Sequence, residues 1–330
     1  MLREWKATEK PEEGELKKRL IAARDKLARQ QMLIKEKKVP VLVLMEGWGT
    51  AGKGSCIGEI IQNIDPRFFK VESMEKKTEE EERRPFLYRH FAKIPEAGKF
   101  VFLDSGWMGE TVGDYLRGEL KESEYTKRIE SIRRFERQLT DNGYLVMKFF
   151  LHISEKEQKK RIKHLTEEKD TMWRVNRNDM WQNHHYEKCV DAFSFYMKDT
   201  SMPSAPWYII DAKSKKWTEL QVLETLTQGI DIAFNNRDMA VPLLQNVFPL
   251  EKMPLLSEIP LDKELADEEY QEELKRLQTR LGDLHNRLYR KKVPVIIAYE
   301  GWDAAGKGGN IKRITEALDP RGYEVHPIAS

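Results

Sequence analysis

Two glycine-rich segments of the chain contain residues that could hold phosphate. The first, residues 46–54, reads EGWGTAGKG, and the second, residues 300–308, reads EGWDAAGKG. Both contain the pattern G-x-x-x-x-G-K, in which glycines let the backbone turn tightly and expose its N–H groups. These donors, the positive end of a following helix and the lysine form a cradle for phosphate oxygens. The alternative is a strand-to-helix turn with no ligand, but the occurrence of the pattern twice in similar contexts favours the cradle.

The sequence predicts which residues of each segment contact phosphate. In the first segment they are Gly47, Thr50, Ala51, Gly52, Lys53, Gly54 and Ser55. In the second segment they are Gly301, Ala304, Ala305, Gly306, Lys307, Gly308 and Gly309. Lys53 and Lys307 are also candidate catalytic residues, because each would place a positive charge beside the transferred group.

The two segments lack the residue that usually holds Mg²⁺ in such loops. A Ser or Thr normally follows the lysine, but Gly54 and Gly308 stand there. Phosphoryl transfer needs a metal to offset charge, so carboxylates must supply the ligands. Asp303 lies inside the second loop, whereas the corresponding residue of the first loop is Gly49. Asp104, at the end of a predicted strand, is the other candidate metal ligand and catalytic residue; alternatively it caps a strand or helix.

The elements around these residues predict an α/β fold. Short apolar runs at 39–45, 99–104, 144–154 and 205–212 are typical of strands buried on both faces. Helical patterns occupy 15–36, 53–63, 78–92, 122–141, 155–168 and 178–200. Strands that alternate with helices indicate a parallel sheet covered on both faces, in a three-layer αβα arrangement.

The chain contains an internal duplication. Residues 293–328 match residues 39–74 without gaps, with identities that include Pro40/Pro294 and Asp65/Asp319. We therefore predict a first P-loop domain at 1–235, a linker at 236–263 and the beginning of a second domain at 264–330. The linker contains Pro242, Pro249, Pro254 and Pro260. The second copy, with a strand at 293–299 and another at 323–328, has too few strands to bury a sheet on both faces. We expect it to be loosely held, or docked on the first domain or on another copy.

The composition excludes several classes of protein. The net charge of the 330 residues is +2, so the overall charge implies no nucleic-acid partner. Two cysteines, Cys56 and Cys189, form no disulfide framework, which fits a reduced cytoplasmic location. No apolar run approaches the roughly 20 residues needed to span a bilayer. Cations at 83–90 and along 155–177 could face a phosphate chain, or could be ordinary solvated surface.

At this point several segments resemble one family. EGWDAAGKGG, DPRFFKV, FVFLDSGWMG and TSMPSAPWYIIDA are similar to segments of the polyphosphate kinase 2 family, especially its two-domain polyphosphate:AMP phosphotransferases. The resemblance implies a P-loop kinase-like fold with a mobile helical lid. It also implies phosphoryl transfer between inorganic polyphosphate and AMP or ADP, with Mg²⁺, and association into homo-oligomers. Trp173 and Arg174 resemble a family Trp-Lys pair and are expected to contact nucleotide or phosphate.

The first copy departs from the family pattern at residues that should meet phosphate. The family motif resembles FDRSWYGRV, and this chain has LDSGWMGET at 103–111. Asp104, Trp107 and Gly109 match, but Ser105 and Glu110 replace arginines. With Gly49 in the loop, the first copy resembles a degenerate repeat, so we expect this chain to be weak or inactive alone. The alternatives are a non-catalytic polyphosphate-binding or dimerisation module, and an ATP-dependent small-molecule kinase on the same fold.

Overall fold

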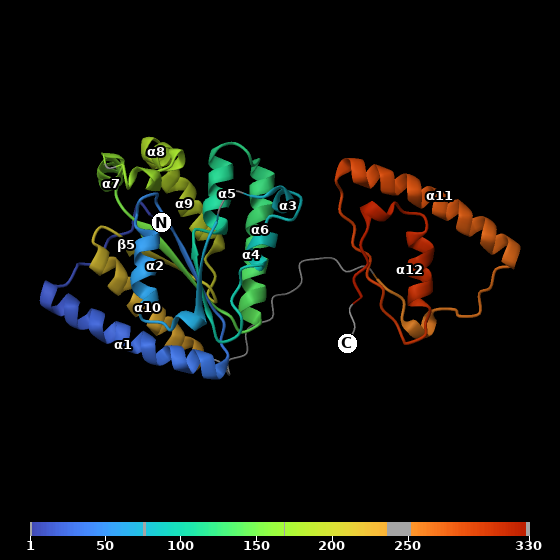
Figure 1. The fold of residues 1–330 in the computed structure, drawn as a ribbon, viewed down its shortest axis with the longest axis horizontal. Helices are drawn as coiled ribbons and strands as arrows, with labels where there is room; N and C mark the ends of the chain where they lie inside the picture. Colours follow the sequence, from blue (N-terminus) through green and yellow to red (C-terminus); the bar gives the residue numbers. More distant parts are fainter. Residues whose placement is uncertain (1, 75–76, 168, 236–251, 328–330) are drawn as a thin grey trace. The chain divides into compact units, whose positions relative to one another are not determined.

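The computed structural model describes residues 2–74, 77–167, 169–235 and 252–327. The chain divides into two compact units, Met1–Leu243 and Leu244–Ser330. Figure 1 shows both units. In the described residues, no helix is long and apolar enough to cross a membrane.

The first unit is built on a five-stranded parallel sheet. Its strands lie in the order β2-β3-β1-β4-β5, with β1 at the centre. They are β1 (Val41–Gly47), β2 (Phe69–Ser73), β3 (Phe100–Asp104), β4 (Leu145–His152) and β5 (Trp207–Asp211). Val43 of β1 is opposite Phe102 on one side and Met147 on the other. Residues 41–46 are all buried, as a continuous apolar run predicts for a central parallel strand.

Helices cover both faces of this sheet (Figure 1). On one face α2 (Lys53–Ile61) and α10 (Lys215–Asn235) pack on the strands, and α1 (Glu13–Lys37) packs on α10. On the other face lie α5 (Trp107–Leu116), α6 (Glu122–Asp141) and α9 (Tyr186–Thr200). The expected α/β fold with a parallel sheet and two helical layers is therefore confirmed.

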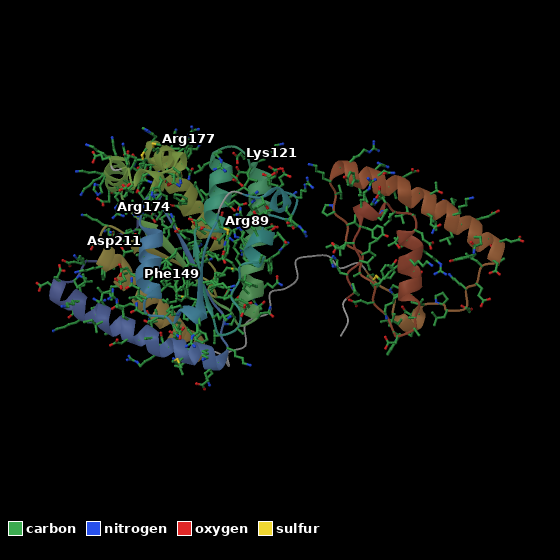
Figure 2. The ribbon with its side chains drawn as sticks, in the orientation of Figure 1. Arg89, Lys121, Phe149, Arg174, Arg177 and Asp211 are labelled. Carbon is green, nitrogen blue, oxygen red and sulfur yellow. The ribbon has the colours of Figure 1, made fainter. Side chains whose placement is uncertain are left out.

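A helical segment follows the carboxyl end of β4. It comprises α7 (Glu155–Glu167), a 3₁₀ turn η2 (Met172–Arg174) and α8 (Arg177–His184), and it leads into α9. We call residues 155–184 the lid. Arg174 and Arg177 lie in the lid, whereas Phe149 lies in the sheet (Figure 2). The lid contains Trp173 and Arg174, for which the family resemblance implies contact with nucleotide or phosphate.

One strand and two long helices among the described residues of the first unit were not predicted, and two predicted helices are broken. Strand β2 carries only half-buried and exposed residues, so it lacks the apolar run that marked the other strands. Helices α5 and α10 were also missed. The predicted helix 78–92 is two short helices, α3 (Glu79–Glu82) and α4 (Tyr88–Phe91), because Pro85 lies between them. The predicted helix 178–200 breaks at His185 into α8 and α9.

The described residues of the second unit repeat α1, α2 and η1 of the first unit and contain no sheet. Its elements are η3 (Leu256–Glu258), α11 (Asp267–Lys291), α12 (Lys307–Thr315) and η4 (Pro320–Gly322). The strand predicted at 293–299 is wrong, and so is the one at 323–328 over its described part: in the described residues of this unit both runs are unpaired. Ile296 is 94% exposed, whereas Leu42 of β1 is fully buried. Of the predicted linker, residues 236–251, with Pro242 and Pro249, lie outside the described residues.

Candidate active site

A cavity of about 880 Å³ opens at the carboxyl ends of β1 and β3. Its wall includes the first glycine-rich loop, the beginning of α5, the helices α3 and α4, and the lid. Six cations line it: Lys53, Lys77, Arg84, Arg89, Arg117 and Arg128. Ligands of open parallel sheets bind outside the carboxyl ends of the strands, so this is the expected place for a substrate.

The first loop adopts a conformation that depends on its glycines. Gly47 and Gly52 have φ angles of 141° and 95°, where side chains are strained. A Cβ at Gly47 would also lie 2.8 Å from the backbone nitrogen of Leu151. Helix α2 begins at Lys53, directly after Gly52. The first N–H groups of a helix have no intrahelical partner, so the turn from Gly52 to Ser55 presents donors and the positive helix end together.

The lid holds the first loop through hydrogen bonds to its backbone. The N–H of Gly49 donates to Gln182 Oε1 (3.0 Å), and Gln158 Nε2 donates to the carbonyl oxygen of Gly49 (3.2 Å). Arg161 Nη1 donates to the carbonyl oxygens of Thr50 and Ala51 (3.2 and 3.0 Å). The predicted phosphate-binding residues Thr50 and Ala51 are therefore fixed by a lid cation. The Arg161 guanidinium thus binds the backbone of the loop and does not line the cavity.

Lys53 and Asp104 both lie near the end of the first loop. Lys53 lines the cavity, and its Nζ is 3.5 Å from the carbonyl oxygen of Trp48. Asp104 ends β3, and its Oδ2 would be 3.1 Å from a Cβ at Gly54. The structure thus brings three predicted site residues, Lys53, Gly54 and Asp104, to the beginning of α2. The cavity-lining set of described residues does not include Asp104.

The side chain of Glu46 accepts hydrogen bonds from two backbone N–H groups at the beginning of α5. The N–H groups of Gly106 and Gly109 donate to its Oε1 at 2.9 and 3.2 Å. Burial raises the pKa of Glu46 to about 7, although these hydrogen bonds and the charge of Lys53 act in the opposite direction. These two amides, which follow the sheet at Asp104, are therefore bonded to a carboxylate of the protein itself.

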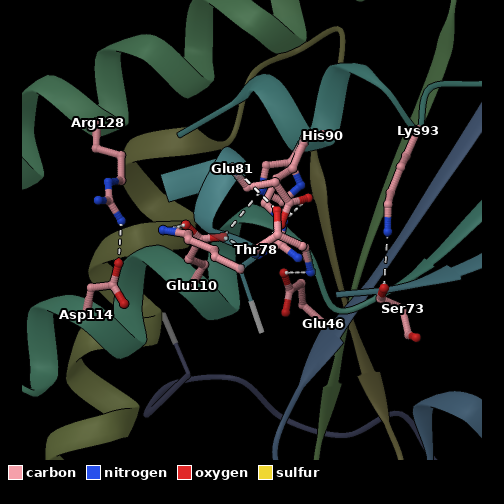
Figure 3. Close-up of polar contacts among 12 residues, drawn as sticks. Glu46, Ser73, Thr78, Glu81, His90, Lys93, Glu110, Asp114 and Arg128 are labelled. Atoms are coloured by element: carbon pink, nitrogen blue, oxygen red, sulfur yellow. Dashed lines mark hydrogen bonds and ion pairs between the residues drawn. The ribbon is translucent and has the colours of Figure 1, made fainter. Parts of the chain in front are cut away.

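Most cations that line the cavity are paired with carboxylates, and Figure 3 shows Arg128 beside Asp114. Lys77 Nζ lies 2.6 Å from Glu110 Oε1, and Arg128 Nη1 lies 2.7 Å from Asp114 Oδ2. Arg117 also pairs with Asp114, at 2.6 Å. A bound phosphate chain would have to compete with these carboxylates for the paired cations.

For the cations at 83–90 the sequence allowed either contact with a phosphate chain or ordinary solvated surface. Arg84 and Arg89 line the cavity, but Arg84 pairs with Glu80 at 3.1 Å. Arg89 and His90 are buried, and His90 Nε2 lies 3.6 Å from Glu110 (Figure 3). Burial lowers the pKa of His90, which favours its neutral form.

Trp173 and Arg174, the lid residues predicted to contact nucleotide or phosphate, do not line the cavity. Trp173 is 75% exposed, and the guanidinium of Arg174 lies over its ring, 5.4 Å from the centroid. The described residues that line the cavity include neither of them. Both side chains stand on η2, at the turn between the two lid helices.

The second loop has the same backbone conformation as the first. Gly301 and Gly306 have φ angles of 158° and 86°, and Ala304, at 62°, corresponds to Thr50, at 63°. Lys307 Nζ donates to the carbonyl oxygens of Gly301 and Trp302 at 2.7 and 2.9 Å. The remaining predicted residues, Asp303, Ala305, Gly308 and Gly309, are exposed. The local sequence thus sets the loop shape twice, but only the first loop has a sheet beside it in the described residues.

The family profile described as "Polyphosphate kinase 2" matches residues 10–238 and 264–330, which includes both loops. The chain belongs to the polyphosphate kinase 2 family. Its family match spans both copies of the duplication, which confirms the resemblance seen in the sequence.

Relatives of this chain in the polyphosphate kinase 2 family carry related names. It is 31% identical over 320 residues to "Polyphosphate:AMP phosphotransferase" of Pseudomonas aeruginosa, covering 95% of this chain and 64% of that protein. The protein of the same name from Pseudomonas syringae pv. tomato is 32% identical, with coverages of 94% and 63%. A crystal structure of a "putative polyphosphate kinase 2 from Pseudomonas aeruginosa" aligns with a TM-score of 0.81 and 28% identity, over 100% of this chain and 65% of that one. The chain therefore spans less than two thirds of these relatives.

The sequence did not predict the cavity residues that come from the lid. Asp179 and Gln182 line the cavity from α8, and Asn176 stands at its N-cap. Burial raises the pKa of Asp179, against the hydrogen bond from the Asn176 N–H and the charge of Lys53. The signal available was the segment NRND, an Asn followed three residues later by an acid, which marks a helix beginning. Nothing in that pattern says which side chain reaches the loop.

Proposed function

We propose that this chain is part of a phosphotransferase that moves a phosphoryl group between inorganic polyphosphate and AMP or ADP. The observation that carries the proposal is the recurrence of one loop conformation, with Lys53 and Lys307 at equivalent places, in two units matched by one family. The names of the Pseudomonas relatives support the substrates. Catalysis of this kind consists of positioning and charge stabilisation, which a loop of backbone donors and a lysine can supply.

In the first unit, the turn from Gly52 to Ser55 and the side chain of Lys53 would bind phosphate oxygens. In the second unit, Lys307 and the residues around Gly306 would have that role. We assign Trp173 and Arg174 to nucleotide contact, because an exposed indole with a guanidinium over it can stack on a base. These side chains bind and orient; none of them needs to change its covalent state.

The residues of the site fit Mg²⁺ that is held partly by substrate. In the described residues, no three His, Cys, Asp or Glu side chains gather into a metal site. Mg²⁺ is usually held by one or two carboxylates, waters and substrate phosphates, so such a cluster is not required. Asp104, beside the beginning of α2, and Asp303, in the second loop, are the carboxylates we assign to it. When bound, Mg²⁺ would offset the charge of the transferred group.

We further propose that the first unit alone transfers phosphoryl groups weakly. Ser105 and Glu110 stand where the family pattern has arginines, and Lys77 is paired with Glu110. Each lost electrostatic contact costs about 10²–10³ in rate. A second candidate function follows from the same pairs: the first unit could bind polyphosphate, or support dimerisation, without chemistry.

The test is an assay with AMP or ADP, polyphosphate and Mg²⁺, together with polyphosphate binding measured by calorimetry. We expect binding that weakens in Lys53→Ala and slow turnover. Binding without any transfer supports the second candidate. A strict requirement for ATP with indifference to polyphosphate would contradict both and favour a small-molecule kinase. Family-like rates that disappear in Lys53→Ala but survive Lys307→Ala would contradict the weak activity proposed for the first unit.

The sequence supports further proposals about the organisation, location and partners of the chain. We propose domains at 1–235 and 264–330 joined by the linker 236–263, a homo-oligomer, a cytoplasmic location, and no nucleic-acid or membrane partner. The oligomer is tested by the mass in solution measured by light scattering.

A further inference from the structure

Gly49, the residue that replaces the loop aspartate, faces a carboxylate from the lid. A Cβ built at Gly49 would lie 2.6 Å from Asp179 Cγ, and closer still to Asp179 Oδ1. The side chain of Asp179 therefore fills the space in which a side chain of residue 49 would begin. At the equivalent place of the second loop the chain has Asp303, and in the described residues of that unit no lid is present.

Asp179 is held in this position by contacts that leave one oxygen toward the loop. Its Oδ2 accepts from the N–H of Asn176 at 2.9 Å, and its own N–H donates to Asn176 Oδ1 at 3.0 Å. This reciprocal pair is a capping box at the beginning of α8. Oδ1 is the oxygen nearest to Gly49, and Asp179 lines the cavity together with Lys53.

The loop is fixed against the same helix. Gln182, one turn after Asp179, accepts from the N–H of Gly49 at 3.0 Å. The close approach of α8 to the loop therefore requires glycine at position 49, since any side chain would meet Asp179. A loop aspartate and a carboxylate at position 179 exclude each other in this arrangement.

We propose that Asp179 supplies the carboxylate that the first loop has lost, and is a ligand of the divalent cation that accompanies polyphosphate in the first unit. The inference rests on the proposed function of the first loop. The first repeat then keeps two carboxylates beside its phosphate cradle, Asp104 from the sheet and Asp179 from the lid. Closure of the lid and binding of the cation are coupled, because the ligand arrives with α8.

The competing explanation is that Asp179 only caps α8. The side-chain oxygen of Asn can accept the same hydrogen bond from the Asn176 N–H, so Asp179→Asn keeps the cap and removes the charge. A cap-only role therefore leaves cation binding unchanged in Asp179→Asn, whereas a ligand role does not.

The experiment uses the full chain carrying Asp303→Asn and Lys307→Ala, so that the second loop does not contribute. Mn²⁺ binding is followed by electron paramagnetic resonance with and without inorganic polyphosphate. We expect Asp179→Asn to weaken Mn²⁺ binding in the polyphosphate complex by at least about tenfold. Polyphosphate binding without a cation stays within about threefold of the parent. The matched control is Glu167→Gln, which removes an exposed charge from lid helix α7.

Exchange of the two positions supplies a second measurement. Gly49→Asp alone should lower the Tm, because its side chain meets Asp179, and Asp179→Ala should relieve this loss. The double variant should recover Mn²⁺ binding relative to Asp179→Ala. Unchanged Mn²⁺ binding in Asp179→Asn, or no recovery in the double variant, overturns the inference but not the proposed function. If the parent shows no polyphosphate binding that depends on Lys53, both the inference and the proposed function of the first loop are overturned.

Discussion

The indole of Trp48 stacks on the ring of Tyr186, with ring centroids 4.1 Å apart and planes 10° apart. Trp48 is fully buried, and its Nε1 donates to His152 Nδ1 at 3.0 Å. The Trp48 side chain therefore anchors the first loop to α9 and to the end of β4. The equivalent Trp302 of the second loop is 85% exposed. The two tryptophans, which occupy equivalent places in the repeated motif, therefore have different surroundings.

Trp48→Ala should destabilise the first unit by about 3–5 kcal/mol, the usual cost of deleting a large buried aromatic side chain. Trp302→Ala is the matched control in the same motif, and we expect a change within about 0.5 kcal/mol. Urea unfolding followed by the far-ultraviolet circular dichroism of each variant gives the comparison. Equal losses in the two variants would show that the second loop is packed in solution.

Glu136 and Lys148 form a buried ion pair, which gives a second prediction. Their atoms approach to 2.6 Å, and Lys148 also donates to the carbonyl oxygen of Thr200. Burial raises the pKa of Glu136 and lowers that of Lys148, and each charge opposes the shift of the other. Lys148→Met should cost about 3–5 kcal/mol, because it leaves an uncompensated buried carboxylate.

The double variant Glu136→Gln with Lys148→Met should recover part of that loss, since no buried charge is left alone. Thermal unfolding of the parent, both single variants and the double variant measures the coupling. Additive losses would mean that the two groups act independently.

Glu110 predicts a dependence of stability on pH. Burial alone would raise its pKa, but its contacts with His90, at 3.6 Å, and with Lys77, at 2.6 Å, outweigh burial and lower the pKa from 4.5 to about 2. Arg89 lies 3.9 Å away and adds positive charge. A carboxyl whose folded pKa is depressed stabilises fully above its unfolded pKa and loses that contribution as the pH falls through its folded pKa.

Glu110→Gln should therefore lower the free energy of unfolding at pH 7 by roughly 1–2 kcal/mol, reduced for partial exposure. The difference from the parent should shrink between pH 4.5 and pH 2. Denaturant titrations across this range test it, with the exposed Glu130→Gln as control. A difference that grows toward low pH would contradict the sign.

Arg161 joins three segments of the first unit. Its guanidinium donates to the loop carbonyls of Thr50 and Ala51, and Nη2 donates to Ala212 at 2.7 Å. Arg161→Lys cannot make these parallel bonds, so we expect a loss of about 1–3 kcal/mol and weaker polyphosphate binding. Lys163→Ala, on the same helix and 79% exposed, should change neither. Calorimetric titration with polyphosphate and a thermal melt measure both effects.

The second unit should be cleaved before the first. Lys291 and Lys292 are exposed beside an apolar run in which Ile296 is 94% exposed, whereas residues 41–46 are buried. Limited trypsin digestion followed by mass spectrometry should release fragments from 264–330 while residues 39–212 stay intact. Equal survival of both regions would show that the second unit is protected, for instance by docking on another copy.

The sequence by itself determined the features that depend on neighbours along the chain. The loops, with positive φ at Thr50 and at Ala304, recur because glycine spacing sets local backbone geometry. Helices α1 and α11 also begin and end at equivalent residues, because both copies have acids in the first turn and bases in the last turn of one helical pattern. The central strand, β1, was predicted because an apolar run between polar helices marks a buried parallel strand.

Only the tertiary structure decided which of these features form a site. Residues 293–299 carry nearly the same apolar pattern as β1, yet they form no strand in the described residues, because a strand exists only through hydrogen bonds to its neighbours. The position of Asp179 against Gly49 depends on how the lid folds back over the sheet. No periodicity or spacing along the chain encodes that contact, so the carboxylate beside the first loop could be found only in three dimensions.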